Sequence, residues 1–386
     1  MRVSVPGLPQ SILNAKPILS VKSFREATER LTEFIGLGNV AILTGAGVSV
    51  DSGIRAYRGE DGRYMNPNYK PIFYHELVDS SEIGRAFRQR YWLRSYLGYP
   101  PVRDAQPNTT HFALAALQHT SYVSRIITQN VDGLHHKALR IAAPYHWNPA
   151  RLQDNILELH GTLHRVHCNR GHVFNRDIFQ DWLSAANPRW RQYAEELEST
   201  GTQPRTNPDG DVAIEHMGIS YNEFVVPECP DCLLEDHRNS VHKPGVVFFG
   251  ESIPKAVKER SYVVDYYCVD VMKPTFVVKS FHDVEDSDRL LIIGTTLATY
   301  SAFRLLKHAL EHKKPVMVLN VGPTRADSLP GLEKLDVPSG AIMRDVARMA
   351  IGARASEDQV IIQMLQSGIV SPPLPDDNDR FPRTAG

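Results

Sequence analysis

The stretch "LTGAGVSVDSGIRAYRG", residues 43–59, joins a glycine-rich loop to an Asp-Ser-Gly turn, directly after the apolar run Val40–Leu43. An apolar strand that runs into glycines is typical of a phosphate-binding turn. A dehydrogenase fingerprint reads G-x-G-x-x-G; here Gly45 and Gly47 are in place, but Val50 occupies the third glycine position. The stretch therefore favours a nucleotide site without hydride-transfer chemistry, and an ordinary strand-to-helix turn is the alternative.

The succession of an apolar strand and a polar loop recurs along the chain. A helix is expected over 21–38, and strand-and-loop segments begin at 121, 288 and 313, the first two of which continue as helices. Strands that alternate with helices predict an α/β fold with a doubly wound, Rossmann-like parallel sheet. Such sheets bind ligands at the carboxyl ends of their strands. We therefore expect one edge to carry four loops, Gly45–Arg58, Gln129–Asp132, Gly294–Thr296 and Asn320–Gly322.

The composition is that of an ordinary globular protein. The chain has 386 residues, of which 42% are hydrophobic and 23% are charged. A net charge of -1 gives no basic field, so nucleic acid is not expected as a partner. No apolar run approaches the length of about 18 residues that a transmembrane helix needs, so no membrane is expected either. Four cysteines make no disulfide scaffold, and the pair in "CPDC" at 229–232 indicates a reducing compartment and a metal.

Two stretches interrupt the alternation of strands and helices. Residues 60–105 are rich in aromatic residues and arginine and predict a helical module, whereas residues 161–242 hold three of the four cysteines and predict a small inserted module. We therefore expect one folded domain over about 25–365, in which the nucleotide-binding part comprises about 25–59, 106–160 and 243–350.

Both ends of the chain read as tails. Residues 1–24 contain Arg2, Lys16 and several serines but no acid, which suits a transit peptide and equally suits a disordered tail of accidental composition. Residues 366–386 are rich in proline and aspartate and are predicted to be disordered.

Seven motifs, in order along the chain, resemble those of the sirtuins, the NAD-dependent protein-lysine deacylases. They span roughly residues 25 to 350 and are "TGAGVSVDSGI" with "YRG" at 57–59, "TQNVDGLHHKA" at 128–138, "LHGT" at 159–162, "CPDC" at 229–232, "KPGVVFFGE" at 243–251, "IIGTTL" at 292–297 and "LNVGPT" at 319–324. The "QRYW" at 89–92 and the long span between the cysteines are most similar to the class II, mitochondrial branch, the group of the fourth mammalian sirtuin.

The resemblance implies an enzyme that uses NAD as a co-substrate. The acyl-lysine amide oxygen of a protein substrate attacks C1′ of the nicotinamide ribose, nicotinamide leaves, and free lysine and O-acyl-ADP-ribose are released. The resemblance also favours the mitochondrial matrix as the location of the protein, with the cytoplasm or nucleus as alternatives. It does not indicate an oligomeric state. Two other functions stay open: protein mono-ADP-ribosyl transfer, and a catalytically weak NAD-responsive binding module. The second is suggested by Arg55 and Ala56, which replace the proline and the acid usual in the family.

The resemblance also assigns cofactor contacts to the loops at the sheet edge. The backbone N–H groups of Gly45–Gly47, with a helix N-terminus behind them, would face the pyrophosphate. Gln129, Asn130 and Asp132 would hold the nicotinamide ribose and the carboxamide. Ser49, Asp51 and Ser52 suit a purely structural turn equally well, and Arg58 could be a surface arginine. The full set is Gly45, Ala46, Gly47, Ser49, Asp51, Ser52, Gly53, Ile54, Tyr57, Arg58, Gln129, Asn130, Val131, Asp132, Gly294, Thr295, Thr296, Asn320, Val321, Gly322 and Ser339.

Catalysis is expected at His160 and Asn130. An imidazole has an unperturbed pKa of about 6.5, which leaves a neutral base near pH 7. The chain has 16 histidines, and His160 is singled out because it matches the His-Gly of the family. An acyl-lysine peptide would bind as an added strand along Val246, Val247, Phe248, Phe249, Gly250 and Glu251, although this run also suits a plain buried strand.

A structural zinc site, one per chain, is expected from Cys168, His172, Cys229 and Cys232. The family usually has a cysteine where Gly171 stands, so His172 is the substitute ligand, and Cys268 is its rival. The alternative is a pair of buried cysteines without metal. Cys268 lies in the stretch 261–280, which is longer than the family connection and reads as an inserted hairpin or a translated intron.

Overall fold

The computed structural model describes residues 20–58, 71–142, 154–202, 220–251, 279–327 and 329–373, together with residues 8, 64 and 212. Most of the first tail, the last residues of the chain and all but the end of the stretch 261–280 lie outside this part, Cys268 included. The predicted insertion therefore stays a prediction.

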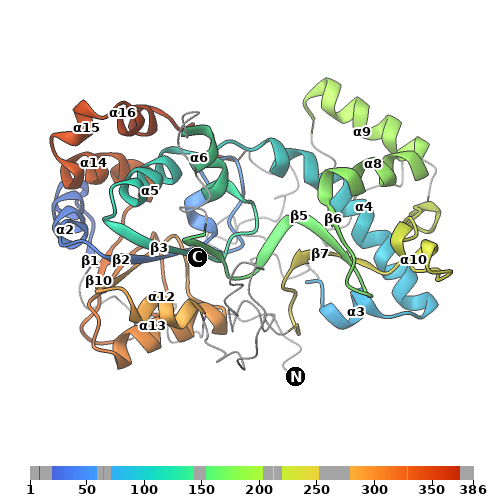
Figure 1. Cartoon of the computed structure of the whole chain (residues 1–386), viewed down its shortest axis with the longest axis horizontal. Helices are drawn as coiled ribbons and strands as arrows, with labels where there is room; N and C mark the ends of the chain where they lie inside the picture. Colours follow the sequence, from blue (N-terminus) through green and yellow to red (C-terminus); the bar gives the residue numbers. More distant parts are fainter. Residues whose placement is uncertain are drawn as a thin grey trace, which may run out of the picture.

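A parallel sheet of seven strands forms the larger lobe (Figure 1). Its order is β1-β10-β9-β8-β2-β3-β4, and every neighbouring pair is parallel. This confirms the predicted doubly wound α/β fold. The strands are β1 (Ser20–Val21), β2 (Val40–Thr44), β3 (Val123–Thr128), β4 (Ile156–Glu158), β8 (Arg289–Ile293), β9 (Val316–Leu319) and β10 (Glu333–Leu335).

Helices cover both faces of this sheet, which explains why its central strands are continuously apolar. Neighbouring side chains of β2 point to opposite faces: Ile42 packs in the core beneath α2, α5, α6, α14 and α16, and Leu43 in the core beneath α12 and α13 (Figure 1). The helices are α2 (Phe24–Gly36), α5 (Thr109–His119), α6 (Leu134–Ala142), α12 (Lys279–Glu285), α13 (Tyr300–Glu311), α14 (Ser339–Ile351), α15 (Arg354–Glu357) and α16 (Gln359–Gln366).

The smaller lobe is built on a three-stranded antiparallel sheet of order β6-β5-β7. Trp92, Phe179 and Phe224 share its core, so the predicted helical and inserted modules pack as one lobe. Its elements are α3 (Tyr74–Val78), α4 (Glu82–Asp104), β5 (Gly161–Cys168), β6 (Val173–Asn175), α8 (Arg176–Ala186), α9 (Pro188–Thr200), the 3₁₀ turn η4 (Tyr221–Glu223), α10 (Pro230–Leu234) and β7 (His242–Val246).

One predicted boundary is wrong. We expected residues from 243 onward to belong to the large nucleotide-binding part, but β7 pairs with β5 in the small sheet, with Lys243 opposite His167. The pairing partner lies far away in the sequence, so the strand pattern alone could not indicate the sheet to which it belongs.

The predicted disorder from residue 366 onward is wrong for residues 366–373. Gln366 ends α16, and the following segment lies in an extended form against the large lobe: Ile369 N–H donates to the Pro107 carbonyl at 3.2 Å and Ser371 N–H to the Asp51 carbonyl at 2.7 Å. Gly368 permits this path, because its φ is +104° and a Cβ there would lie 2.5 Å from the Thr109 nitrogen.

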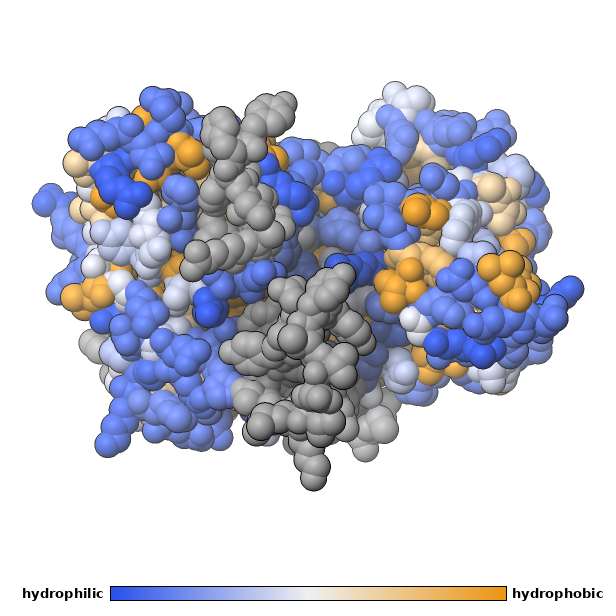
Figure 2. Space-filling model, viewed as in Figure 1, coloured by the Kyte–Doolittle hydropathy of each residue, from blue (hydrophilic) through white to orange (hydrophobic). Residues whose placement is uncertain are grey.

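On the face shown in Figure 2, hydrophilic residues predominate, and apolar residues appear in small, separate groups. In the part of the chain that the structure describes, none of the helices combines the length and hydropathy needed to cross a membrane.

Candidate active site

The four predicted loops do meet at one edge of the large sheet. Each begins where a strand ends, and its first N–H continues the ladder to the neighbouring strand. Three of these bonds are Gly45 to the Ile293 carbonyl at 3.0 Å, Gln129 to the Thr44 carbonyl at 2.9 Å and Gly294 to the Leu319 carbonyl at 3.0 Å; the fourth joins Asn320 to the Leu335 carbonyl at 3.1 Å. The carboxyl edge therefore gathers the loops as the strand pattern predicted.

The glycine loop differs from its prediction. The Gly45 N–H donates to the Ile293 carbonyl, and the Gly47 N–H donates to the Gly294 carbonyl at 2.9 Å. These two N–H groups are therefore not directed at a pyrophosphate. Within the described residues, only the Ala46 N–H of the three has no protein acceptor. The loop continues as a short 3₁₀ turn, η1 (Ala46–Ser49), so no α-helix N-terminus stands behind it.

Close contact with the next loop explains the two glycines. A Cβ at Gly45 would lie 2.6 Å from the Thr295 Cβ, and one at Gly47 would lie 2.8 Å from the Gly294 Cα. Thr296 continues the same segment, and its carbonyl accepts from the Arg325 N–H at 2.9 Å. The glycines therefore let two of the expected cofactor loops touch through their backbones.

A buried hydrogen-bonded network joins the glycine loop to the loop after β3. Ser49 Oγ donates to Asp132 Oδ2 at 2.8 Å and accepts from Asn130 Nδ2 at 3.0 Å. The Leu134 N–H donates to the other carboxylate oxygen at 3.0 Å. Burial raises the pKa of Asp132. Val131, between these residues, ties the loop to β5 by accepting from the Leu163 N–H at 2.9 Å.

The turn at Asp51–Gly53 carries an unsatisfied hydroxyl. Ser52 is 5% exposed, and its Oγ has no hydrogen-bond partner among the described residues. Gly53, at φ +83°, closes the turn on the Val50 carbonyl, and the Ile54 N–H donates to the Ser49 carbonyl at 3.3 Å. Ser52 Oγ therefore lacks the partner that a buried hydroxyl nearly always has.

Tyr57 and Arg58, two expected cofactor contacts further along this loop, both pack against the ring of Tyr64. Tyr57 and Tyr64 stack with centroids 5.5 Å apart, and the Arg58 guanidinium lies 5.0 Å from the Tyr64 centroid. Burial lowers the pKa of Arg58. Arg58 is therefore packed against aromatic groups, unlike the surface arginine that was the alternative.

The residues expected on the adenosine side form a second supported loop. Asn320 Nδ2 donates to the Val321 carbonyl at 2.8 Å, and the Gly322 carbonyl accepts from Lys334 Nζ at 2.7 Å. Lys334 is buried and pairs with Asp327 at 2.8 Å. Sequence reasoning missed Lys334, which stands in the short strand "EKL" that carries no motif. Ser339 opens α14, where its Oγ contacts Thr110 Oγ1 at 3.1 Å.

His160 lies at the junction of the two lobes, between β4 and β5. Its Nδ1 lies 3.2 Å from the Gln129 carbonyl and its Nε2 lies 2.8 Å from Ser301 Oγ. A carbonyl can only accept, so Nδ1 carries the proton and Nε2 holds the free electron pair in the neutral ring. Burial lowers the pKa of His160 to about 4, which keeps the ring neutral near pH 7. Sequence reasoning missed Ser301, which only the folding of α13 brings to this ring.

Gln129 is braced on both sides of its amide. Its Nε2 donates to Thr295 Oγ1 at 2.9 Å, and its Oε1 accepts from Thr299 Oγ1 at 3.2 Å. These bonds fix the backbone segment whose carbonyl orients His160.

The segment 246–251 runs from β7 past His160. The Val247 N–H donates to the His160 carbonyl at 2.9 Å, and the Phe249 carbonyl accepts from the Tyr74 N–H at 3.0 Å. Inside the segment, Glu251 accepts from the Phe248 N–H at 3.0 Å and pairs with Lys243 at 3.2 Å. The predicted substrate residues, with Val246 at the end of β7 and Gly250 at φ +82°, are therefore held as one turn beside the candidate base.

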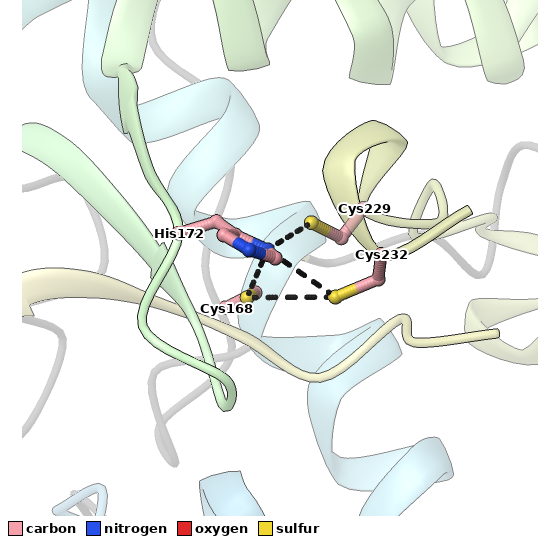
Figure 3. Close-up of side chains that lie close together, drawn as sticks. All are labelled: Cys168, His172, Cys229 and Cys232. Atoms are coloured by element: carbon pink, nitrogen blue, oxygen red, sulfur yellow. Dashed lines mark hydrogen bonds between the residues drawn. The ribbon is translucent and has the colours of Figure 1, made fainter. Parts of the chain in front are cut away.

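The four predicted metal ligands converge on one point (Figure 3). His172 Nδ1 lies 3.5 Å from the sulfur of Cys168 and 3.4 Å from those of Cys229 and Cys232, and the sulfurs of Cys168 and Cys232 are 3.9 Å apart. Tetrahedral zinc with such ligands puts donor pairs about 3.6–3.8 Å apart. These four separations differ from the values for tetrahedral zinc by no more than a few tenths of an ångström, so the donor set fits zinc.

Gly171 is explained by the same turn. Its φ is +93°, a conformation that a cysteine would adopt only with strain, and its N–H donates to the Cys168 carbonyl at 3.0 Å. The turn directs His172, rather than residue 171, toward the sulfurs (Figure 3).

Comparisons with known proteins agree with this architecture. The family model described as "Sir2 family" matches residues 45–273. The "NAD-dependent protein deacylase SIR4" of Batrachochytrium dendrobatidis is 39% identical over 330 residues, which cover 84% of this chain and 94% of that protein. The "NAD-dependent protein lipoamidase sirtuin-4, mitochondrial" of Bos taurus is 34% identical, with 82% of this chain and 85% of that protein covered.

The fold is also similar to solved structures. A Sir2 homologue mutant in complex with ADP-ribose superposes with a TM-score of 0.54 at 23% identity, covering 86% of this chain and 98% of that one. A structure described as "Sir2-p53 peptide-NAD+" has a TM-score of 0.51 at 20% identity and covers 86% and 98%. By its family match and its curated relatives, the chain belongs to the Sir2 family, the sirtuins, in the branch of the sirtuin-4-like proteins.

Proposed function

We propose that the chain is an NAD-dependent protein-lysine deacylase that releases nicotinamide and O-acyl-ADP-ribose. The carrying observation is the position of His160. Its Nδ1 is held by the cofactor-side carbonyl of Gln129, and its own carbonyl accepts from Val247 of the expected substrate segment. Residue His160 thus adjoins both the expected cofactor loop, through its ring, and the expected substrate segment, through its backbone. Relatives named as NAD-dependent protein deacylases, at 39% and 36% identity, support the same reaction.

NAD would be held by the loops at the sheet edge. The unpaired Ser52 hydroxyl and the Ala46 N–H are the groups of the glycine loop that await a partner among the described residues. Asn130 and Asp132 would contact the nicotinamide half, and Asn320, Val321, Gly322 and Ser339 the adenosine half. When bound, NAD supplies an electrophilic ribose carbon with nicotinamide as its leaving group. Nε2 of His160 would then accept a proton from a ribose hydroxyl.

The acyl-lysine substrate would bind along the segment 246–251. β7 is an edge strand of the small sheet, so its outer side has no strand partner within the described residues. A peptide that added there would bind mainly through its backbone, which makes recognition tolerant of sequence. The half-buried ion pair of Lys243 and Glu251 would keep this segment in shape before the substrate arrives.

Cys168, His172, Cys229 and Cys232 would bind one structural zinc. Four protein ligands leave no open position, so the ion would hold the small lobe together and take no part in the reaction. Elemental analysis under a competing chelator tests this. We expect about one tightly held zinc in the wild type, faster loss in His172→Ala, and unchanged retention in His237→Ala, an exposed histidine of the same region. A folded, active wild type without zinc would contradict the site.

We propose that the protein acts in the mitochondrial matrix, and the name of the bovine relative as mitochondrial supports this. Imaging of the full chain with a tag at its C-terminus tests the location. A signal confined to the cytoplasm or nucleus would contradict it.

Product analysis tests the reaction. Incubation with NAD and an acyl-lysine peptide should yield nicotinamide, free lysine and O-acyl-ADP-ribose in equal amounts, and little nicotinamide without the peptide. Label transferred from NAD to protein would instead indicate mono-ADP-ribosyl transfer. Binding of NAD without release of nicotinamide would indicate a binding module.

A further inference from the structure

A second group of side chains that could bind a metal lies away from the loops around His160, where α12 and α13 end. Glu285 closes α12, and His308 and His312 stand one turn apart near the end of α13. Glu285 Oε1 lies 2.8 Å from His308 Nε2 and 3.7 Å from His312 Nε2, and all three ligand atoms lie within 4.8 Å of one another.

This geometry suits a transition metal. Two histidines four residues apart present their rings on one face of a helix, the spacing that zinc-binding helices use. Zinc with nitrogen and oxygen ligands at about 2.0–2.2 Å holds its ligand atoms about 3.3–3.5 Å apart. The separations of Glu285 Oε1 from the two histidine nitrogens, 2.8 and 3.7 Å, lie on either side of this value. Small rotations of the three side chains would therefore complete the coordination.

The carboxylate is held for this role by a fourth residue. His282 Nδ1 lies 2.9 Å from Glu285 Oε2, the oxygen that does not face the other two histidines. Metal-bound carboxylates are usually held by such an outer hydrogen bond. Lys314 Nζ donates to the backbone carbonyls of Glu285 at 2.8 Å and Ser287 at 2.6 Å, which fixes the end of α12 to the end of α13. The ligands therefore stand on a rigid frame.

The cluster opens to solvent. The exposed fractions of the His308, Glu285 and His312 side chains are 18%, 32% and 46%, so solvent reaches the cluster. Three protein ligands on a tetrahedral ion would leave its fourth position for water or an outside ligand. Its donors are two imidazoles and a carboxylate, whereas the first cluster has three thiolates. A site of this kind holds zinc less tightly and exchanges it with the medium.

We propose that Glu285, His308 and His312 form a second metal site, which binds one exchangeable divalent transition-metal ion such as zinc. The site clamps α12 to α13 at the amino end of β9, away from the loops around His160. It requires neither NAD nor acyl-lysine, so the proposal stands independently of the deacylase reaction.

Zinc titration of the full chain, purified with its tightly held zinc, tests the proposal. We expect a second, weaker equivalent measured against a chromogenic chelator. His312→Ala and Glu285→Gln should each weaken it at least about tenfold and leave the first equivalent in place. His119→Ala, at the end of α5, should change neither. Cobalt as a second probe should give a visible band without the sulfur-to-metal charge transfer that the thiolate site produces.

Absence of a second equivalent at 100 µM zinc would overturn the proposal. So would a second equivalent that survives both His312→Ala and Glu285→Gln. Far-UV circular dichroism and the retained first zinc show that each variant is folded, so loss of binding cannot be mistaken for unfolding.

Discussion

The Gln129 carbonyl accepts a hydrogen bond from His160 Nδ1, with 3.2 Å between the two atoms. This bond assigns the proton of the neutral imidazole to Nδ1 and leaves Nε2 as the basic nitrogen. Gln129 itself is fixed by Thr295 and Thr299. The orientation of the candidate base is therefore set by the sheet edge that also carries the expected cofactor loops.

The tautomer of His160 can be measured directly. In protein labelled with ¹⁵N-histidine, one ring should show a protonated Nδ1 and an unprotonated Nε2, and should stay neutral to about pH 5, because burial lowers the pKa to about 4. The signal is assigned by its absence from His160→Gln. A protonated Nε2, or titration near pH 6.5, would contradict the assignment.

Stability should fall as the solution becomes mildly acidic. Burial lowers the pKa of His135 to about 3 and those of His136, His160 and His242 to about 4. The unfolded chain, with histidine pKa values near 6.5, takes up more protons between pH 6.5 and 4, so the free energy of unfolding decreases as pH falls through this range. Asp51, Asp132 and Glu158, whose pKa values burial raises, act in the opposite direction and offset part of this loss.

Urea unfolding at pH 7 and pH 6, with zinc content verified at both, checks this. The free energy of unfolding should be lower at pH 6, by on the order of 1 kcal/mol. An equal or higher value at pH 6 would show that these rings are not held neutral in the folded protein.

Asp132→Asn should separate recognition of nicotinamide from recognition of ADP-ribose. The amide can still accept from the Leu134 N–H, and the Ser49 hydroxyl can turn to accept from its NH₂, so the network survives. Toward the carboxamide of nicotinamide, however, the NH₂ group of the new asparagine is a donor where the carboxylate of Asp132 was an acceptor. Calorimetry should show at least about tenfold weaker NAD binding and little change for ADP-ribose. Ser49→Ala should weaken the binding of both NAD and ADP-ribose. If Asp132→Asn lost affinity equally for the two ligands, the assigned role would be refuted.

Gly368→Ala should loosen the turn at Asp51–Gly53. The new Cβ would clash with the Thr109 nitrogen at 2.5 Å and displace the segment whose Ser371 N–H donates to the Asp51 carbonyl. We expect a loss of about 1–3 kcal/mol in unfolding free energy and faster hydrogen exchange at that turn. Gly36→Ala, where a Cβ meets nothing within 4 Å, is the matched control. Unchanged exchange at Asp51–Gly53 would mean that the segment does not support the loop.

The parts of the account that depend on local pattern could be predicted from the sequence. The apolar runs gave β2 and β8, and their polar continuations met at one edge because parallel strands end together. His172 as the fourth zinc ligand followed from residue chemistry at a fixed spacing, and the four ligand atoms converge as that prediction requires.

Features that depend on distant contacts could not be predicted in this way. The N–H groups of Gly45 and Gly47 are taken up by β8 and the loop after it, about 250 residues further along the chain. Ser301 reaches His160 only because the first turn of α13 lies against the loop after β4. The segment after Gln366 reads as a polar tail until its backbone pairs with residues 107 and 51. Each of these contacts joins residues that no local periodicity relates.

The rate of nicotinamide release in His160→Ala tests the central claim most directly. With NAD and an acyl-lysine peptide, the rate should fall by about 10²–10⁴-fold, the usual cost of a lost general base, while the affinity for NAD stays close to that of the wild type. His119→Ala, at the far end of α5, should release nicotinamide at the wild-type rate. A His160→Ala protein that binds NAD and works within threefold of the wild-type rate would contradict the account.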